Sequence, residues 1–420
     1  MFKKFCNSAA LLSLLVAVPA MADEPIMSKY KVSFGGYVKL DYAHNSNASG
    51  PTTTPAGAAQ GGFKEESIFT AKQSRMWFKV AGPTFMGAKT NALIEADFYG
   101  ANSLANEFGN MRMRHAYGSL DWDNTQVLFG QWWDVFGPAA ADTIDFRQGG
   151  DSGAANAPRV PQIRLTQKLN LNADNSLKFI LAVQNPTQDT PVAASAAQGV
   201  AGTVGTTYGT APNAAGQIMF SSKALGTSPG FMGMGLNPLQ VGVFGQVGNE
   251  KVVGSPTSVD TFGYGVYAFV PLISSTDGKS RAMTLSLEGQ AYQAAGMNVS
   301  GATSISLVGP ATARQAAKGY GLYGQLKFYP TQDLGLTAGY TRRGAINYAD
   351  YRAVSATTTQ KYNSIAYVNA TYDLNAAVRL ATEFEHHATQ YMGVVAATAN
   401  NTASDYGKNN VIRFAAYYFF

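Results

Sequence analysis

Hydrophobic and polar residues alternate along most of the chain from residue 30 to the C-terminus. In the first segment, Val38 and Leu40 fall on one parity, and Lys39 and Asp41 fall on the other. Because successive side chains of a β-strand point to opposite faces, this pattern indicates strands with one apolar and one polar face. About sixteen segments of roughly ten residues repeat the pattern, and this length suits strands that cross a bilayer at a tilt.

The connections between these segments broadly alternate between short turns and long stretches rich in Gly, Ala, Ser, Thr and Asn. The short connections are 123–124, 171–175, 330–333 and 374–375, and the long ones are 45–67, 134–158, 186–213, 294–316, 344–360 and 388–409. This alternation is typical of outer-membrane barrels, which have short periplasmic turns and long external loops. We therefore expect an all-β fold, a transmembrane antiparallel β-barrel of about 16 strands.

The chain ends on NVIRFAAYYFF, in which Phe414, Tyr418 and Phe420 share one parity. An open sheet edge in hydrocarbon leaves unpaired backbone groups, each of which costs several kcal/mol, so a spanning sheet must close on itself. We expect this segment to be the closing strand, with Tyr418 and Phe420 facing lipid. A terminal Phe with Tyr two residues before it also resembles the sorting signature of outer-membrane proteins.

The N-terminus has the features of an export signal. Lys3 and Lys4 precede the apolar stretch AALLSLLVAV, and Ala20-Met21-Ala22 forms a small-x-small cleavage site. This arrangement predicts a cleaved signal peptide over residues 1–22, because the apolar stretch is too short to span a membrane. Residues 23–420 would then form a single transmembrane barrel domain in the cell outer membrane.

Composition excludes several classes of protein. The one cysteine, Cys6, lies in the predicted leader, so disulfide scaffolds, zinc ribbons and thiol catalysis are excluded for the mature chain. The formal net charge is +5, but no run of basic residues occurs, so we expect no nucleic-acid partner. Charged residues make up only 14% of the chain, which fits a sheet with one face in lipid.

Three motifs suggest other chemistry, and we assign none of them to a catalytic, metal or cofactor site. GYGLYG at 319–324 matches a dinucleotide fingerprint, but that fingerprint needs a following helix and here the strand pattern continues. His386 and His387 are adjacent and would point apart on a strand, so they cannot converge on one metal ion. His115 shares parity with Met113 and Tyr117, and we expect it to face the membrane interface or a neighbouring subunit.

The polar face carries many basic residues, which we expect to line the pore. They are Arg75, Lys79, Arg112, Arg114, Arg164, Lys168, Arg343, Arg379 and Arg413. The long connection 134–158 is acidic, and we expect it to fold inward as a constriction loop. Its acidic residues are Asp134, Asp142, Asp145 and Asp151.

Two interpretations of these charges remain open. They could be scattered lumen charges that solvate a wet pore. Alternatively, a basic wall could face an acidic inward loop, and the resulting local field would sort permeating solutes by charge and dipole.

Two stretches, SRMWFKVAGPTFMGAKTNALIEADFYG and MRMRHAYGSLDWDNTQVLFGQWWDVFGP, resemble the DcaP-like family of trimeric outer-membrane porins. The matching features are Ser74-Arg75, Ile94-Glu95-Ala96-Asp97-Phe98, Arg114-His115-Ala116-Tyr117-Gly118 and Gly130-Gln131-Trp132. The resemblance implies a homotrimer of barrels that passes small anionic solutes such as dicarboxylates, with Arg75, Arg112 and Arg114 in a basic pore lining. The family's best-known members carry a periplasmic helical extension, whereas only residues 23–28 precede the first strand here. We therefore expect any trimer to rest on barrel contacts.

The sequence thus predicts a passive diffusion channel with a preference for small anions, surrounded by outer-membrane lipid and lipopolysaccharide. The alternative is a barrel that sheathes or scaffolds a partner such as an electron-transfer protein. Charged side chains at strand centres favour the channel, because a barrel filled by a partner would need a wider ring than this strand count supplies.

Overall fold

The computed structural model describes residues 29–47, 57–60, 65–100, 109–145, 159–186, 207–209, 211–252, 258–297, 307–308, 315–347, 360–396 and 403–420. The predicted leader, residues 1–22, and the predicted loop residue Asp151 lie outside this part of the chain. No helix in the described part has the length and hydropathy that crossing a membrane requires.

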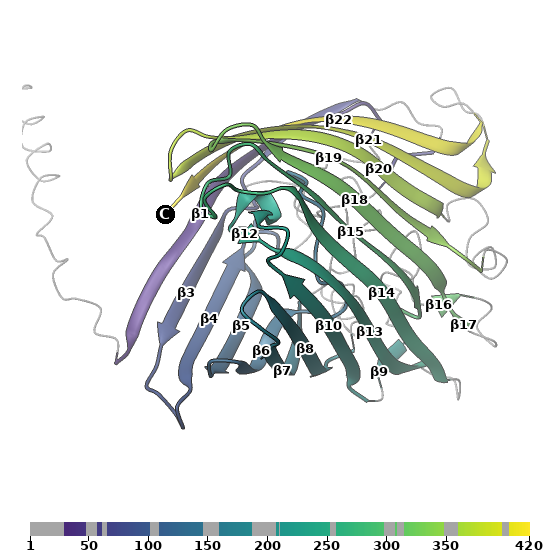
Figure 1. The fold of residues 1–420 in the computed structure, drawn as a ribbon. Helices are drawn as coiled ribbons and strands as arrows, with labels where there is room; N and C mark the ends of the chain where they lie inside the picture. The colour runs from purple at the N-terminus through teal and green to yellow at the C-terminus, as the bar shows by residue number, and fades with distance from the viewer. Residues whose placement is uncertain are drawn as a thin grey trace, which may run out of the picture.

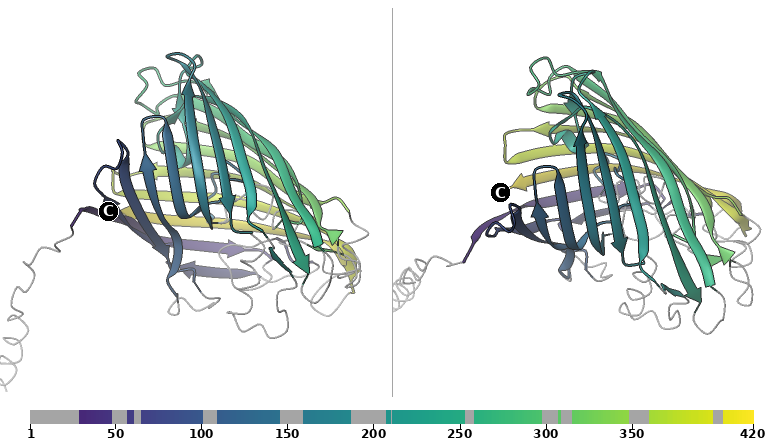
Figure 2. Two further views of the ribbon diagram at one scale, coloured as in Figure 1. Left: turned by 90° about the horizontal axis from the view of Figure 1, so that it is seen from below. Right: turned by 60° about the horizontal axis from the view of Figure 1, so that its bottom comes forward.

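The chain forms one closed antiparallel barrel of tilted strands (Figures 1 and 2). Eighteen segments belong to the main sheet, and two pairs of them, β2 with β3 and β9 with β10, are halves of one interrupted strand because each pair lies against a single neighbour. Sixteen strands therefore surround the interior. The last strand, β22, pairs with β1 and closes the barrel, as the sequence predicted.

The strands of the barrel follow one another around the wall in chain order. Their bounds are β1 Lys31–Asn45, β2 Glu66–Thr70, β3 Arg75–Ala81, β4 Lys89–Asp97, β5 Arg112–Asp121, β6 Thr125–Trp133, β7 Arg159–Asn170, β8 Asn175–Gln184, β9 Thr207–Gly209, β10 Asn213–Ser222, β13 Leu239–Val252, β14 Ser258–Ile273, β15 Thr284–Ala295, β18 Lys318–Tyr329, β19 Leu334–Ala345, β20 Gln360–Asp373, β21 Val378–Val395 and β22 Ser404–Phe419. Two small two-stranded sheets are not part of this ring of strands, β11 Ser228–Pro229 with β12 Leu236–Asn237 and β16 Leu307–Val308 with β17 Gln315–Ala316.

The two faces of the wall differ as the alternation predicts. On β1, Val38 is 56% exposed and Leu40 is 49% exposed, whereas Lys39 between them is fully buried in the interior. Large apolar side chains therefore cover the outside, and polar side chains fill the inside. This is the reverse of a soluble protein, and it suits a barrel whose outer surface contacts hydrocarbon.

The C-terminal strand ends beside the start of β1. Tyr418 lies opposite Val38 with its side chain outward, and Phe420 is 51% exposed with its ring 5.4 Å from that of Phe34. The ring contact and the backbone bond from Gly36 N–H to the Phe420 carbonyl hold the end of the chain in place. We call this the short-turn end of the barrel, because the short connections lie there, and the opposite end the long-connection end.

A β-bulge in β5 changes the direction of His115. The register with β4 shifts between Glu95 and Ala96, so that Arg114 and His115 both lie on the inner side. His115 is 3% exposed, and the centroid of its ring lies 4.2 Å from that of Trp132 in a tilted arrangement. The expectation that it faces the membrane or a neighbouring subunit is wrong, because a bulge reverses the parity of every residue after it.

The GYGLYG stretch lies within β18, and its second glycine, Gly321, makes room for an aromatic ring. A Cβ at Gly321 would lie 2.4 Å from the ring of Tyr292 on β15, which is closer than a side-chain carbon can approach. The glycine therefore packs against a neighbouring strand, as a glycine in a strand interior often does.

The connection 223–238 at the short-turn end is much longer than its neighbours and turns into the barrel. It contains β11, the 3₁₀ helix η3 Phe231–Gly233 and β12, and η3 lies at the same end as the C-terminus (Figure 1). The backbone N–H of Met232 donates to Asp142, which belongs to an inward loop from the opposite end. The alternation of long and short connections did not predict this insert.

Candidate functional site: the barrel interior

The segment that follows β6, residues 134–145, lies inside the barrel against the inner wall. Its apolar side chains pack in turn on successive strands: Val135 on Ile180 of β8, Phe136 on the aromatic cluster of β13 to β15, and Ile144 near Tyr417 of β22. The ring centroids of Phe136 and Phe244 are 5.0 Å apart in an edge-to-face arrangement. The segment therefore follows the wall from β8 to β22, which leaves the wall from β3 to β8 facing open space.

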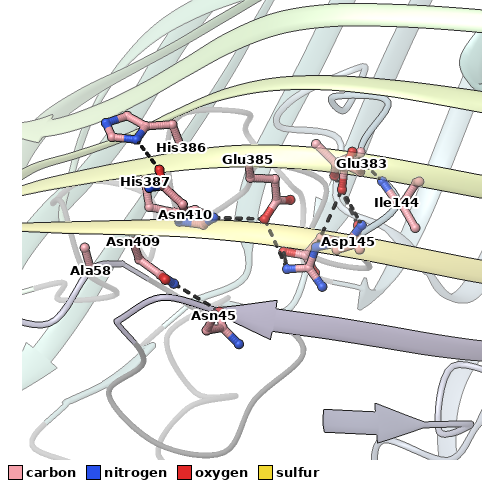
Figure 3. A network of polar contacts seen from close by, with 12 residues as sticks. Asn45, Ala58, Ile144, Asp145, Glu383, Glu385, His386, His387, Asn409 and Asn410 are labelled. Atoms are coloured by element: carbon pink, nitrogen blue, oxygen red, sulfur yellow. Dashed lines mark hydrogen bonds and ion pairs between the residues drawn. The ribbon is translucent and has the colours of Figure 1, made fainter. Parts of the chain in front are cut away.

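Hydrogen bonds from the wall fix the far end of this inward loop (Figure 3). The carboxylate of Glu383 accepts from the backbone N–H of Ile144 at 2.9 Å and from that of Asp145 at 3.3 Å. Lys39 Nζ donates to the Ile144 carbonyl at 2.9 Å. Asn369 Nδ2 donates to the Asp142 carbonyl at 2.6 Å. Charged partners make such hydrogen bonds strong, so the loop is firmly attached.

Arg413 lies behind the inward loop and is only 2% exposed. Its guanidinium lies 3.1 Å from Glu385 Oε2, 3.6 Å from Glu383 Oε1 and 3.9 Å from Asp145 Oδ2. The expectation that Arg413 faces the pore is therefore wrong. The loop covers it, and it balances the carboxylates that hold the loop.

Arg343 is also 2% exposed, so it does not face open space either. Arg379 pairs with Asp373, with 3.0 Å between Nη2 and Oδ2, and donates to the Met232 carbonyl of the insert. Lys79 and Lys168 are exposed near the short-turn end, and Lys79 Nζ lies 4.5 Å from the Trp77 ring. The basic residues predicted along the polar face thus have different surroundings and do not form one continuous wall.

Hydrogen bonds and ion pairs hold the acidic residues of the inward loop against the wall. Asp134 accepts hydrogen bonds from Gln184 and from its own loop at Phe136. Asp142 Oδ2 accepts from Met232 N at 2.8 Å and lies 3.7 Å from Lys327 Nζ. Asp142 and Asp145 therefore do not face a basic wall across the pore, whereas Asp134 shares a cavity with Arg164 and Lys178.

Burial changes the acid–base behaviour of two of these loop carboxyls. It raises the pKa of Asp134 to about 6, although the hydrogen bonds from Phe136 and Gln184 oppose the shift. Burial also raises the pKa of Asp142 to about 6 against the attraction of Lys327. The loop therefore carries groups that change charge close to neutral pH.

The wall formed by β3, β4 and β5 carries arginines that are already paired. Arg112 binds Asp97 through two hydrogen bonds of 2.7 and 3.0 Å. Arg114 donates to Glu95 at 2.6 Å and to Asp97 at 2.9 Å, and Arg75 lies 3.7 Å from Glu95. Two carboxylates thus offset most of the charge of three arginines. The parity of Glu95 and Asp97 indicated that they face inward, but the partners could not be assigned without the strand register.

Three further cations lack such partners. Among the described residues, no carboxylate lies within ion-pair distance of Arg159, Arg164 or Lys178, which occupy β7 and β8. Arg159 lies over the Trp133 ring at 5.1 Å, and Arg164 Nε approaches only the Thr166 hydroxyl, at 3.4 Å. Lys178 falls among the polar positions of its segment, so the sequence indicates that it faces inward. Alternation alone does not distinguish a cation with a carboxylate partner from one without.

Arg164 and Lys178 line a cavity of about 500 Å³ between the inward loop and the wall. Trp132 and Trp133 contribute aromatic surface to it, and Asp134 lies at its edge. Glu288 also reaches this cavity, but its carboxylate already accepts from Tyr267, Gln325 and Lys327. Asp134 is hydrogen-bonded by neutral groups, so two unpaired cations face one carboxyl here and the net charge in this part of the interior is positive.

The two adjacent histidines point apart, as expected on a strand. His387 is buried with Nε2 at 2.9 Å from Glu385 Oε2, whereas His386 faces outward and bonds Asn410 at 2.7 Å (Figure 3). Within the part of the chain that the structure describes, no group of three or more His, Cys, Asp or Glu side chains could hold a metal ion.

Comparison with known proteins identifies solved structures with this architecture, whereas no protein-family model and no curated protein sequence matches the chain. The outer membrane channel DcaP of Acinetobacter baumannii is similar at a TM-score of 0.68 and 17% identity, over 94% of this chain and 99% of that one. An anion-selective porin from Comamonas acidovorans is similar at a TM-score of 0.56 and 10% identity, over 93% of this chain and 100% of that one. OmpT of Vibrio cholerae in its trimer form is similar at a TM-score of 0.53 and 11% identity, over 93% of this chain and 99% of that one. Together with its sixteen closed antiparallel strands and inward loop, these likenesses show that the chain has the fold of the outer-membrane porins.

Proposed function

We propose that this protein is a passive diffusion channel of the outer membrane that prefers small anions such as dicarboxylates. One observation carries the preference. Arg164 and Lys178 line the cavity beside the inward loop without a carboxylate partner among the described residues, whereas the arginines of β3 to β5 are paired. Unbalanced charge on a wall of low dielectric constant attracts ions of opposite sign to a narrow passage.

The interior supports conduction better than a scaffold role. Residues 134–145 and the insert at 223–238 already occupy the barrel and bond to each other through Asp142 and Met232. A partner protein inside the barrel would have to displace both segments and expose the charges behind them. A small solute needs only the remaining space along β3 to β8.

Reversal potentials in a salt gradient test the anion preference. The Arg164→Gln/Lys178→Gln variant should lose most of the anion over cation permeability at low salt. Its difference from the parent should shrink as salt rises, because salt screens the two charges of the parent. Lys89→Gln/Lys223→Gln is the matched control, since it removes two exposed cations at the short-turn end. A double variant with the parent's reversal potential at low salt would show that these cations do not select.

We further infer a homotrimer, because the fold is shared with OmpT, an outer membrane protein of Vibrio cholerae solved in a trimer form. The long-connection end would face outward and the short-turn end the periplasm. Light scattering of the protein in detergent gives the mass of the assembly and tests the trimer directly.

A further inference from the structure

The insert at 223–238 leaves the wall between β10 and β13 and reaches the inner side of β21. Ser228 Oγ donates to the carbonyl of Ile273 at 2.8 Å, so the first part of the insert is fastened to the end of β14. Arg379 Nη1 on β21 donates to the carbonyl of Met232 at 3.0 Å. In the ring of sixteen strands, β21 lies six strands beyond β13, so η3 extends well into the mouth of the barrel at the short-turn end (Figure 1).

Met232 in η3 is held in a backbone conformation that is unfavourable for a residue with a side chain. Its φ is 49° and its ψ is 29°, in the left-handed region. Its N–H donates to Asp142 Oδ2 at 2.8 Å, and its carbonyl accepts the bond from Arg379. Such a conformation persists where the surroundings fix it from several sides. Charged groups of the inward loop and of the wall therefore fix η3 in one position.

Gly233, the next residue, packs directly against the wall. Its φ is 75°, and a Cβ at this position would lie 2.6 Å from the Tyr329 hydroxyl and 2.8 Å from Arg281 Nη1. Arg281 and Arg379 both donate to the carboxylate of Asp373, so this part of the wall is itself fixed. The insert thus has no room to withdraw towards the wall.

Two side chains of the insert line the cavity beside the unpaired cations of β7 and β8. Phe231 and Asn237 belong to its lining, and so do residues 137–140 of the inward loop. The bond between Met232 and Asp142 joins the two segments. The cavity volume of about 500 Å³ lies within the range of about 300–1,000 Å³ that is typical of small-molecule sites. The insert and the inward loop therefore border one compartment that is large enough for a solute.

We propose that the insert at 223–238 sets the size limit of the passage at the short-turn end, and that Phe231 is the side chain that narrows it. A solute that has reached Arg164 and Lys178 passes Phe231 before it leaves the barrel. The groups that line the narrowest points of a channel determine which solutes pass. The cations then select by charge and the insert by size, at separate places. This inference rests on the proposed conduction, but not on the anion preference.

The need to connect two strands does not explain the insert. At the same end of the barrel, β5 joins β6 and β20 joins β21 through the short turns 122–124 and 374–377. A turn of that kind would join β10 to β13 without an inward segment and without a strained residue between two charged groups. The position of the insert in the mouth is therefore the feature that calls for a role.

Liposome swelling with uncharged sugars measures the size limit without a contribution from charge. In the first variant, Asn-Gly replaces residues 230–235 and closes a two-residue hairpin at the pair Pro229 and Leu236. Loss of η3 should raise the swelling rate of a trisaccharide relative to that of a monosaccharide by at least about threefold, because pore width controls entry. Phe231→Ala should raise the same ratio by a smaller factor.

Met234→Ala is the matched control, because Met234 belongs to the same insert but is 64% exposed. It should keep the parent's ratio, and heat-modifiable migration on gels confirms that each variant is folded. An unchanged ratio in both test variants would overturn the proposal and leave the insert with a structural role alone. A raised ratio in the replacement but not in Phe231→Ala would overturn the role assigned to this side chain.

The result can be separated from the proposed function. Arg164 and Lys178 are present in both test variants, so each variant should keep the anion preference of the parent in reversal potentials. A parent that passes no monosaccharide would overturn conduction and the size limit together. A parent that passes monosaccharides and does not prefer anions would overturn the anion preference alone, and the sugar ratios of the variants would decide the size limit.

Discussion

Arg114 and Arg164 both point into the barrel, yet their surroundings differ. Arg114 is 3% exposed and bonds two carboxylates, whereas Arg164 borders the cavity with only a weak hydroxyl contact. Buried charges are costly unless they are paired, so the first arginine serves stability and the second remains available to solutes. The same residue type on the same face of the wall can therefore have opposite roles.

Replacing Arg114 should destabilise the barrel. Arg114→Gln leaves Glu95 and Asp97 short of positive charge in a buried place, and breaking such a pair costs about 3–5 kcal/mol. Urea unfolding in lipid vesicles measures the change in the free energy of unfolding. Arg164→Gln is the control and should change it by less than about 1 kcal/mol. Equal losses in both variants would contradict this distinction.

Selectivity should depend on pH through Asp134. Its folded pKa of about 6 lies above the ordinary value, so the protonated form is favoured in the folded state. Raising the pH from 4 to 7 therefore ionises it, lowers the free energy of unfolding and adds a negative charge beside the cavity. The ratio of anion to cation permeability of the parent should therefore fall as the pH rises from 4 to 7.

Asp134→Asn separates this effect from other titrations. It should remove most of the pH dependence, because Asp142 titrates behind the loop against Lys327. Reversal potentials at pH 4, 5, 6 and 7 provide the measurement. A variant that retains the parent's pH profile would assign the titration to another group.

At the scale of elements, the strands and their two faces follow from alternation, because lipid outside and water inside impose opposite polarity on neighbouring residues. The inward loop was predictable from the length and acidity of 134–158. The bulge at Arg114 and His115 was not, since one inserted residue leaves no compositional signal. The pairing of Arg112 with Asp97, and of Arg413 with Glu385, depends on strand register, which alternation does not specify.

The inward loop should loosen when its acceptor on β21 is removed. Glu383→Ala takes away the partner of the Ile144 and Asp145 N–H groups and unbalances Arg413. Each charge-assisted hydrogen bond contributes about 1.5–3 kcal/mol, so the loop should leave the wall more often. Single-channel recordings should show altered conductance with more fluctuation. Thr382→Ala, on the outer face next to it, should behave as the parent, and steady parental currents in Glu383→Ala would contradict the attachment.

At the scale of the whole molecule, closure joins residues from the two ends of the chain, as β22 pairs with β1. The first and last strands therefore lie side by side in the wall. The C-terminus lies at the end of the barrel that carries the short turns. The sequence predicted this architecture because every unpaired edge is unfavourable in hydrocarbon. It did not predict the insert at 223–238, since the alternation of long and short connections indicates a short turn at this end.

The orientation of the barrel can be read from accessibility on whole cells. A cysteine placed at Ala197 or Ala397, in long connections, should react with an impermeant thiol reagent. One at Asn124, in a short turn, should not react until the membrane is opened. Labelling at Asn124 alone would invert the proposed topology.

The attachments of the inward loop also constrain the order of assembly. Its anchors are distant in the chain: Lys39 lies 105 residues before Ile144, and Glu383 lies 239 residues after it. These anchors become neighbours only when the first and last strands have met, so the loop cannot take its final position in an open sheet. Contacts of such large sequence separation form late because they follow the ordering of the intervening chain. The passage thus reaches its final width as the last step of folding, after the wall has sealed.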